Sequence, residues 1–345
     1  MKTNIREGTG FMSDVAVSTA DFPGGRTRVS MAVVGAGALG GVFAWAMHRA
    51  GHDVSVCVRS PLDELVVTTA AGEERVPVQI VTEPGRLRPV QWVLLAVKAF
   101  DTMGTAPWLT ALCDENTTVL ALQNGVDQAE SVRELVPEAT VVPAMVYVQA
   151  EREAPGHIRL AINQGIDIPA GRKAMQVRAL FNGSGVDVRL QEDLTTAAWL
   201  KLMLNVATNS LTALTLRRME VLQDDGVREL AVGLMREAAE VGVSAGAHLT
   251  EQDVQRTLDL ASTYADGGTS MLHDRLAGSP LEHEALNGAV VRLAEVHGID
   301  VPLNRAVAAL LRALRPLDSV TTTAGRTDPC GPSDWPDHDT GNPAR

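Results

Sequence analysis

The sequence predicts an α/β domain built on a parallel sheet, followed by an all-helical domain. The chain has 345 residues, more than one ordinary hydrophobic core accommodates. Short β-rich apolar runs recur in its first half, and long amphipathic helices fill the second. We expect the α/β domain over 29–190 and the helical domain over 191–317. The polar and Gly/Pro-containing ends, 1–28 and 318–345, are expected to be a disordered extension and a disordered tail.

The expected strands of the first domain are near-continuous apolar runs. Helical or polar segments separate the earlier ones, which is the pattern of a parallel sheet covered on both faces. The runs lie at 29–35, 53–59, 92–98, 117–123 and 140–148. Two later runs, HIRLAI and VDVRL, either extend this sheet or form its edge.

The second domain is expected to be helical throughout, because the β signal stops after residue 191 and apolar residues recur at helical spacing. The expected helices span 192–214, 226–243, 250–264, 270–277, 282–298 and 302–315.

Composition narrows the classes of partner. A net charge of −12 disfavours a nucleic-acid or anionic-membrane partner. Three scattered cysteines without a Cys/His cluster predict neither a disulfide framework nor a metal site, and fit a reducing cytoplasm. No long apolar segment or secretory signal is evident. We expect a cytoplasmic protein with a small-molecule partner, as a monomer or a homodimer.

A glycine loop, GAGALGG, directly follows the first expected strand and opens a helix. In that context G-x-G-x-x-G is typical of a Rossmann dinucleotide-binding domain. The glycines allow a tight turn, approach of a pyrophosphate and close helix packing, and the helix start offers free N–H groups. We expect the cofactor to contact the whole loop, which comprises Gly35, Ala36, Gly37, Ala38, Leu39 and Gly40.

The ends of the later strands indicate which cofactor binds. NAD-binding folds usually carry an acidic residue at the end of the second strand, whereas this chain has Arg59, which suits the 2′-phosphate of NADP(H). Lys98, Gln123 and Asn124 end later strands, so we expect them to line a cleft at the carboxyl edge of the sheet.

The segment Trp199–Leu214 carries an unusual polar stripe. It reads as a helix that is apolar almost all round, yet Lys201, Asn205 and Asn209 are spaced by four residues and share one face. Burial of such groups is costly without partners. The stripe therefore indicates either a polar network between helices or one wall of a binding cleft, and the glycine loop favours the cleft.

A second block, 269–288, supplies candidates for the facing wall. Ser270 stands at an expected helix start, where it is either an N-cap or a ligand group. Glu282 is expected in the first turn of the next helix, where the negative charge of an acidic residue interacts favourably with the helix dipole.

Four blocks of the sequence resemble the ketopantoate reductase (2-dehydropantoate 2-reductase) family. They are VVGAGALGG, LALQNGV, WLKLMLNVATNSLTAL and SMLHDRLAGSPLEHEALNG, in that order along residues 30–315. The resemblance implies a Rossmann domain and a helical domain with the active site between them. The activity it implies is NADPH-dependent reduction of 2-dehydropantoate to (R)-pantoate, for pantothenate and coenzyme A biosynthesis.

The resemblance also implies roles for individual residues. Lys201 falls on the family's catalytic lysine, a general acid, and Glu282 on its acidic partner, which also lies near the nicotinamide. The remaining matches are substrate positions at Asn205, Asn209 and Ser270, a residue meeting both cofactor and substrate at Asn124, basic cofactor contacts at Arg59 and Lys98, and a main-chain cofactor contact at Ala150.

The chain departs from the family pattern beside these residues. Ser210 replaces a proline, and Leu281, His283 and Glu284 replace the residues around Glu282. These changes support one alternative, a relative that acts on a different 2-oxo or 2-hydroxy acid in specialised metabolism. A second alternative is a non-catalytic NADP(H)-binding protein, against which the retention of Lys201, Glu282 and their partners argues.

Overall fold

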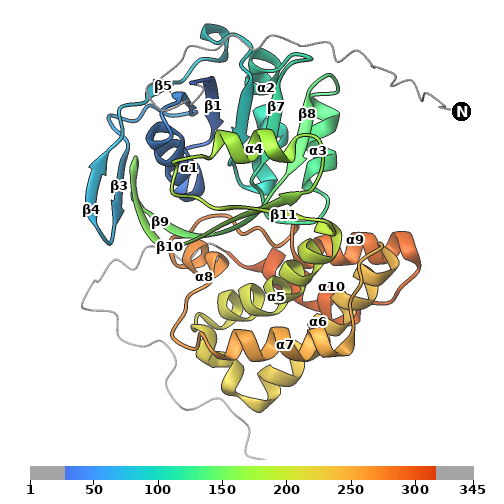
Figure 1. The fold of residues 1–345 in the computed structure, drawn as a ribbon. Coiled ribbons are helices and arrows are strands. Elements are labelled where there is room, and N and C mark those ends of the chain that lie inside the picture. The colour runs from blue at the N-terminus through green and yellow to red at the C-terminus, as the bar shows by residue number, and fades with distance from the viewer. Residues whose placement is uncertain (1–27, 316–345) are drawn as a thin grey trace, which may run out of the picture.

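The structure, a computed structural model, describes residues 28–315, an α/β part followed by a helical part (Figure 1). The α/β part is organised around a six-stranded sheet in the order β5-β2-β1-β6-β7-β8, with every pairing parallel. Its strands are β1 (Ser30–Val34), β2 (Asp53–Cys57), β5 (Gln79–Val81), β6 (Trp92–Leu95), β7 (Thr118–Ala121) and β8 (Thr140–Pro143). All five predicted runs contribute to this sheet.

Both faces of the parallel sheet are covered, as continuous apolar strands require. Met31 and Val33 of β1 point into one apolar core with helix α1 (Ala38–Arg49), whereas Ala32 and Val34 point into another. The second core is closed by α2 (Ala106–Leu112) and α3 (Gln128–Leu135).

A second sheet covers the α1 side, and the sequence did not predict it as a separate element. Its order is β11-β10-β3-β4, with β9 paired to β10. The strands are β3 (Val66–Thr69), β4 (Gly72–Arg75), β9 (Met145–Ala154), β10 (His157–Pro169) and β11 (Val188–Gln191), and α4 (Ala174–Leu180) joins the last two.

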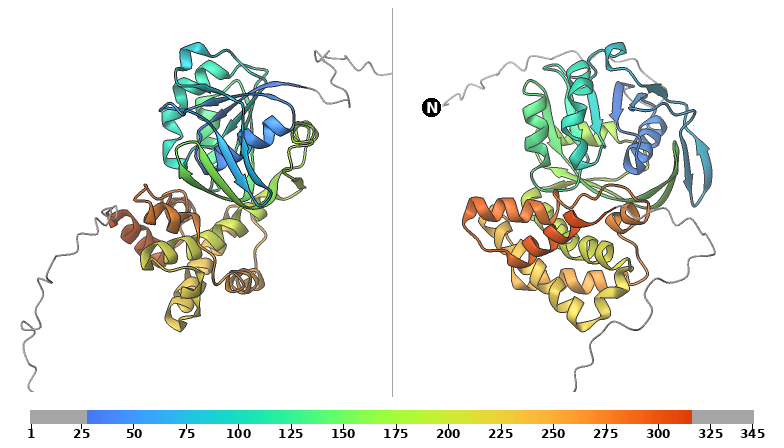
Figure 2. Two further views of the ribbon diagram at one scale, coloured as in Figure 1. Left: turned by 90° about the vertical axis from the view of Figure 1, so that its left-hand side faces the viewer. Right: turned by 180° about the vertical axis from the view of Figure 1, so that it is seen from behind.

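The expectation that HIRLAI and VDVRL extend or edge the parallel sheet was therefore wrong. The predicted run 140–148 divides between β8 and β9, and β9 turns back at Gly156, which has φ +77°, into a long antiparallel pairing with β10. Exposure alternates over the first half of β10, as in a strand with one buried face, whereas residues 165–168 are all buried. In Figures 1 and 2 this sheet lies at the base of the α/β part, and β10 contacts α5 of the helical part.

The helical part is arranged around its first helix, α5, which packs against most of the others. The helices are α5 (Leu194–Thr215), α6 (Asp225–Ser244), α7 (Glu251–Ser262), α8 (Ser270–Leu276), α9 (Asn287–His297) and α10 (Pro302–Ala313). Short 3₁₀ helices lie at Pro84–Arg86, Ala99–Asp101 and Met103–Thr105 in the α/β part, and at Met219–Gln223 in the helical part. Asp193 starts α5 by accepting a 2.9 Å hydrogen bond from the N–H of Thr196.

One predicted helix start was wrong. The segment before α9 was expected to be helical from residue 282, but α9 begins at Asn287 and Glu282 lies outside it, before a turn. The Glu282 carboxylate is held by the main-chain N–H of Ala99 from the α/β part, a tertiary contact that propensity cannot anticipate.

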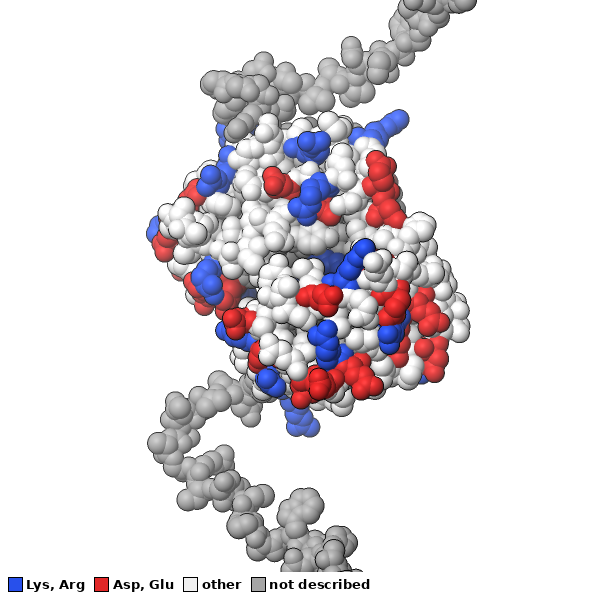
Figure 3. Space-filling view, turned by 60° about the horizontal axis from the view of Figure 1, so that its bottom comes forward, with Lys and Arg blue, Asp and Glu red and all other residues white. Residues whose placement is uncertain are grey.

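The expected disordered segments lie outside the described residues, apart from Arg28 at one edge. Within residues 28–315, no helix combines the length and apolar composition that a membrane crossing requires. On the face shown in Figure 3, acidic and basic side chains are interspersed.

Candidate active site between the two parts

The polar stripe of α5 faces the α/β part at its Lys201 end, whereas Asn209, two turns farther along, is buried against α8. Leu202, Met203 and Val206 of α5 are buried in the helical core, whereas Lys201 and Asn205 are only partly buried. The residues of the stripe therefore contact polar groups, whereas the other faces of α5 pack in the apolar core of the helical part.

Lys201 is held by main-chain and side-chain acceptors of the α/β part. Its Nζ donates to the carbonyl oxygen of Val146 at 2.7 Å and to Asn124 Oδ1 at 3.3 Å, and it lies 5.4 Å from the centre of the Tyr147 ring. Burial lowers the pKa of Lys201 from 10.5 to about 8, although the carboxylates of Glu282 and Asp167 oppose the shift. A lysine in this state is mainly protonated at neutral pH and gives up its proton more readily than an exposed lysine.

Glu282 lies between α8 and α9 of the helical part, reaches across to the α/β part, and is only 6% exposed. Its carboxylate accepts hydrogen bonds from Lys98 Nζ at 3.2 Å, from Asn124 Nδ2 at 3.2 Å and from the N–H of Ala99 at 3.0 Å. Asn124 thus connects Glu282 with Lys201, because its amide donates to one and its oxygen accepts from the other.

Lys98 is shared by two carboxylates, since its Nζ also lies 2.6 Å from Asp274 Oδ2 of α8. Burial by itself lowers the pKa of Lys98, but the charges of Glu282 and Asp274 outweigh burial and raise it above its usual value. Burial raises the pKa of Asp274 despite its contact with Lys98. These ion pairs connect the two parts of the chain at the edge of the site.

The C-terminal end of the stripe, at Asn209, contacts helix α8. Asn209 Nδ2 donates to Ser270 Oγ at 3.3 Å, so the two polar groups predicted from separate blocks are neighbours. Ser270 was considered as an N-cap, but the cap of α8 is Thr269, whose hydroxyl accepts from the N–H of Leu272 at 3.2 Å. Ser270 is an exposed residue, and its hydroxyl, which accepts from Asn209, can still donate to a ligand.

The glycine loop has the geometry that a dinucleotide pyrophosphate needs. Gly35 adopts φ +97°, and a Cβ on Gly40 would lie 1.9 Å from the Gly35 carbonyl oxygen, so both positions require glycine. A Cβ on Gly37 would meet nothing within 4 Å, which leaves open space above the loop. No side chain caps α1 at Gly37, so its first N–H groups are free for a phosphate.

Three other predicted cofactor residues, Arg59, Gln123 and Ala150, differ in their exposure and in their contacts. Arg59 is 76% exposed and lies 3.0 Å from Asp101, beyond the end of β2. The Gln123 side chain is buried and donates to Thr102 Oγ1 at 2.8 Å and to the Val97 carbonyl at 3.1 Å, so it braces neighbouring loops rather than lining the cleft. Ala150 lies within β9, opposite Leu160 of β10.

Sequence reasoning missed several groups of this site. The Val146 carbonyl carries no side-chain signal, and Tyr147 lies in an apolar run that reads as sheet core. Asp274 had a usable signal, because it follows Ser270 by four residues on one helical face. Asp167, buried in β10, forms an ion pair with Arg189 at 2.6 Å.

Comparison with known families covers almost all of the described chain. A family model described as "Ketopantoate reductase PanE/ApbA" matches residues 31–173, and "Ketopantoate reductase PanE/ApbA C terminal" matches residues 193–315. Proteins of Caulobacter vibrioides and Mycobacterium tuberculosis named 2-dehydropantoate 2-reductase are each 37% identical over 286 residues. These matches cover 82% of this chain and 98% and 97% of the relatives.

Solved structures agree with this assignment. A PanE/ApbA family ketopantoate reductase from Ralstonia eutropha is 32% identical with a TM-score of 0.77, covering 82% of this chain and 97% of that one. A dimeric ketopantoate reductase from Staphylococcus aureus is 26% identical with a TM-score of 0.75, covering 82% and 98%. A D-mandelate dehydrogenase structure with NADH, 20% identical with a TM-score of 0.76 and covering 82% and 97%, shares the fold. The chain belongs to the ketopantoate reductase family and is an oxidoreductase.

Proposed function

We propose that the protein reduces 2-dehydropantoate to (R)-pantoate with NADPH, and that the reaction serves pantothenate and coenzyme A biosynthesis. The observation that carries the proposal is the arrangement around Lys201. Its ammonium lies at the junction of the two parts, bonded to Asn124 and near Glu282, on the same helix face as the Asn209–Ser270 pair. The names of the 37% identical relatives supply the substrate.

The residues of the site suit this chemistry. When bound, NADPH supplies the hydride. Lys201 gives its proton to the ketone oxygen as the carbonyl carbon accepts the hydride, so the product is an alcohol, and Lys201 then regains a proton from solvent. Asn205, Asn209 and Ser270 offer neutral donors that orient the substrate's carboxylate and hydroxyl without adding charge.

Glu282 keeps Lys201 effective as an acid. Without a nearby carboxylate, burial would lower the Lys201 pKa further, and a deprotonated amine could not protonate the ketone. Asn124 fixes the positions of Glu282 and Lys201 relative to each other, because it forms a hydrogen bond with each of them. We propose Lys201 and Glu282 as the catalytic residues.

For the cofactor we propose NADP(H). The glycine loop fits a pyrophosphate, and Arg59 stands where a 2′-phosphate would lie beyond β2. The Arg59–Asp101 pair is exposed, so opening or sharing it for a phosphate costs little. Lys98, Asn124, Ala150 and Glu282 are further proposed cofactor contacts, whereas Gln123 supports them through the Val97–Thr102 loop.

The positions that depart from the family pattern are not among the residues proposed to hold the substrate. Ser210 is fully buried and donates to Asn287 rather than facing the stripe. Leu281, His283 and Glu284 line a cavity to which Lys201, Asn205 and Asn209 do not contribute. The changed residues therefore lie away from the groups proposed to hold the substrate.

The proposal is tested by mixing the purified protein with NADPH and following the loss of cofactor absorbance with 2-dehydropantoate, then with other 2-keto acids. We expect the highest kcat/KM for 2-dehydropantoate and a clear preference for NADPH over NADH. Turnover of only another acid would refute the substrate, and no turnover with any acid would favour a non-catalytic NADP(H)-binding protein. Equal use of NADH would refute the role of Arg59.

We also propose a cytoplasmic location and a homodimer. The free thiols of Cys57 and Cys113 suit a reducing compartment, and a dimer is described for the Staphylococcus aureus relative. Light scattering of the purified protein at several concentrations tests the dimer.

A further inference from the structure

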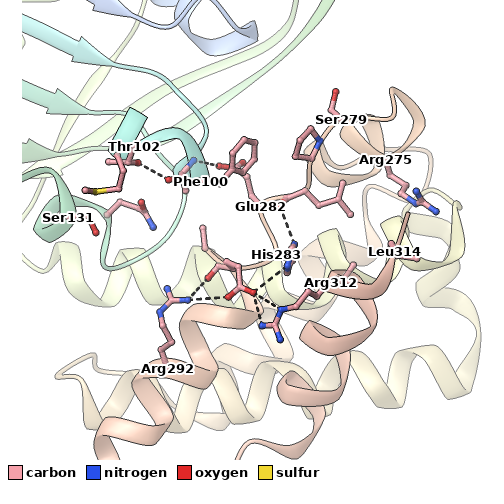
Figure 4. Close-up of a pocket in the computed structure, with 18 of the residues that line it drawn as sticks. Phe100, Thr102, Ser131, Arg275, Ser279, Glu282, His283, Arg292, Arg312 and Leu314 are labelled. Carbon is pink, nitrogen blue, oxygen red and sulfur yellow. Dashed lines mark hydrogen bonds and ion pairs between the residues drawn. The ribbon is translucent and has the colours of Figure 1, made fainter. Parts of the chain in front are cut away.

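A cavity of about 760 Å³ lies beside the proposed active site but is distinct from it (Figure 4). Its walls come from both parts of the chain: the loop at 99–103 and the start of α3 on one side, and the segment 278–285 with the end of α10 on the other. Glu282 is the group it shares with the site, whereas Lys201, Asn205 and Ser270 do not line it.

The lining of this cavity combines apolar surface with arginines. Phe100 is 47% and Met103 is 66% exposed, unusually high values for large apolar side chains. Arg292 and Arg312 are already paired with Glu284, at 3.5 and 2.7 Å. The cavity therefore suits an apolar group, and the three carboxylates in its lining are already paired with basic side chains. Besides the two contacts to Glu284, Arg292 lies 2.9 Å from Asp127, and Lys98 lies 3.2 Å from Glu282.

Two further arginines at the rim have no such partner. Within residues 28–315, neither Arg275 nor Arg315 forms an ion pair, and the buried Nε of Arg275 has no hydrogen-bond partner there. Figure 4 places Arg275 near Leu314, at one end of the cavity. These groups leave positive charge for an acidic ligand next to the apolar surface.

The described chain ends at this rim. Arg315 lines the cavity, and its carbonyl oxygen accepts a hydrogen bond from the Arg275 guanidinium. The family model also ends at residue 315, and relatives are matched over 97–98% of their length by 82% of this chain. Residues 316–345 are thus an addition to the family fold that starts at the cavity.

The added segment has the complementary chemistry. Between residues 328 and 339 it carries four aspartates, no lysine or arginine, and a single large apolar side chain, Trp335, within SDWPDHD. We propose that this segment docks in the cavity of the same molecule, with Trp335 against Phe100 and Met103 and with Asp334 and Asp337 facing Arg275 and Arg315.

The tether makes such docking favourable even if the contacts are few. Nineteen residues lie between Arg315 and Trp335, and a random-coil chain of that length would span on the order of 25 Å. Its end is therefore held near the cavity at an effective concentration of about a millimolar. Because the walls belong to both parts of the chain, a docked indole braces them against each other beside Glu282.

Cross-linking in the full-length chain tests the proposal, because the segment contains its own cysteine, Cys330. Met103→Cys places a thiol in the cavity, and a short bismaleimide can then join it to Cys330. Val243→Cys, on α6 and outside the cavity lining, is the matched control at a half-exposed valine. Mass spectrometry identifies the linked peptides separately from those of Cys57 and Cys113.

We expect the link from position 103 to form severalfold more efficiently than that from position 243, at a yield independent of protein concentration. Adding Trp335→Ala, Asp334→Asn and Asp337→Asn to the Met103→Cys chain should reduce it to the control yield. Equal yields at 103 and 243, or a yield unchanged by the triple substitution, would overturn the proposal. Links between isotopically light and heavy chains, increasing with concentration, would also overturn it by showing a second copy as the occupant.

Discussion

The Lys201 ammonium donates a 2.7 Å hydrogen bond to the main-chain oxygen of Val146 and thereby joins the central helix of one part to the second sheet of the other. A main-chain acceptor cannot change its charge or withdraw to another rotamer. It therefore fixes the position of the ammonium while burial, rather than a tight ion pair, sets its acidity.

Replacing Lys201 should reduce kcat far more than it changes cofactor binding. Lys201→Met keeps the length of the stem but removes the proton donor, and loss of a general acid typically costs about 10²–10⁴-fold. Lys201→Arg is the informative control, because it keeps the positive charge but does not release a proton at working pH. We expect both variants to be strongly impaired in steady-state NADPH oxidation. An arginine variant with near-normal kcat would show that charge alone suffices.

Reduction should slow at alkaline pH. The reaction requires protonated Lys201, whose pKa is lowered to about 8, so kcat/KM should fall about tenfold per pH unit above that value. The same group has the opposite effect on stability. Because its pKa is lower in the folded protein than in the unfolded chain, the protonated lysine destabilises the fold below pH 8, and this cost disappears between pH 8 and 10.5. A pH profile of kcat/KM with no alkaline decline would contradict the assignment.

Glu282→Gln should move this alkaline decline to lower pH. The Glu282 carboxylate raises the Lys201 pKa against burial, and glutamine keeps the shape of the side chain while removing its charge. Lys98 retains Asp274 as a partner, so the variant should fold. A purely structural role for Glu282 would lower activity at every pH without shifting the profile. The displaced profile is therefore the decisive measurement.

Two glycines of the loop should respond differently to the same substitution. Gly37→Ala adds a methyl group to open space in the free protein, so we expect an unchanged thermal midpoint but weaker NADPH binding by fluorescence titration. Gly40→Ala places its Cβ against the Gly35 carbonyl oxygen, so it should lower the midpoint even without cofactor. Equal effects on stability would contradict the proposed roles of the loop.

The features that the sequence predicted are those that depend on the periodicity of apolar residues or on the spacing of particular residues. The five parallel strands, the glycine loop and the shared face of Lys201, Asn205 and Asn209 all depend on local patterns in the sequence. The second sheet was not recognised, because its strands come from distant segments and a run such as HIRLAI fits either sheet.

The sequence indicated which side chains of the proposed site lie near one another, but not how they are connected. Lys201 and Glu282 were expected together, yet their link through Asn124 and the bond to the Val146 carbonyl arise from how the two parts pack. Glu282 was misplaced on a helix because the bond from the Ala99 N–H, 183 residues away in sequence, decides the local conformation. Tertiary contacts of this kind override local propensity.

Beneath the stripe, a buried polar network should contribute to stability. Asn287, fully buried, accepts from Ser210 and donates to the Val206 carbonyl at 3.1 Å and to Asn304 Oδ1 at 3.0 Å, so it connects three helices. Asn287→Ala leaves Ser210 and Asn304 without this partner. We expect it to lower the free energy of unfolding by about 1–3 kcal/mol in urea denaturation, the usual cost of a buried unsatisfied group.

The matched control for this substitution lies on the same helix. Val296 is 78% exposed, so Val296→Ala should change the free energy of unfolding by less than about 0.5 kcal/mol. Asn287→Ala should also retain most of its kcat at low temperature, because Asn287 does not contact Lys201 and its effect on the stripe passes through the α5 backbone at Val206. If it instead abolished turnover while leaving stability unchanged, Asn287 would belong to the catalytic machinery and not to the framework that supports it.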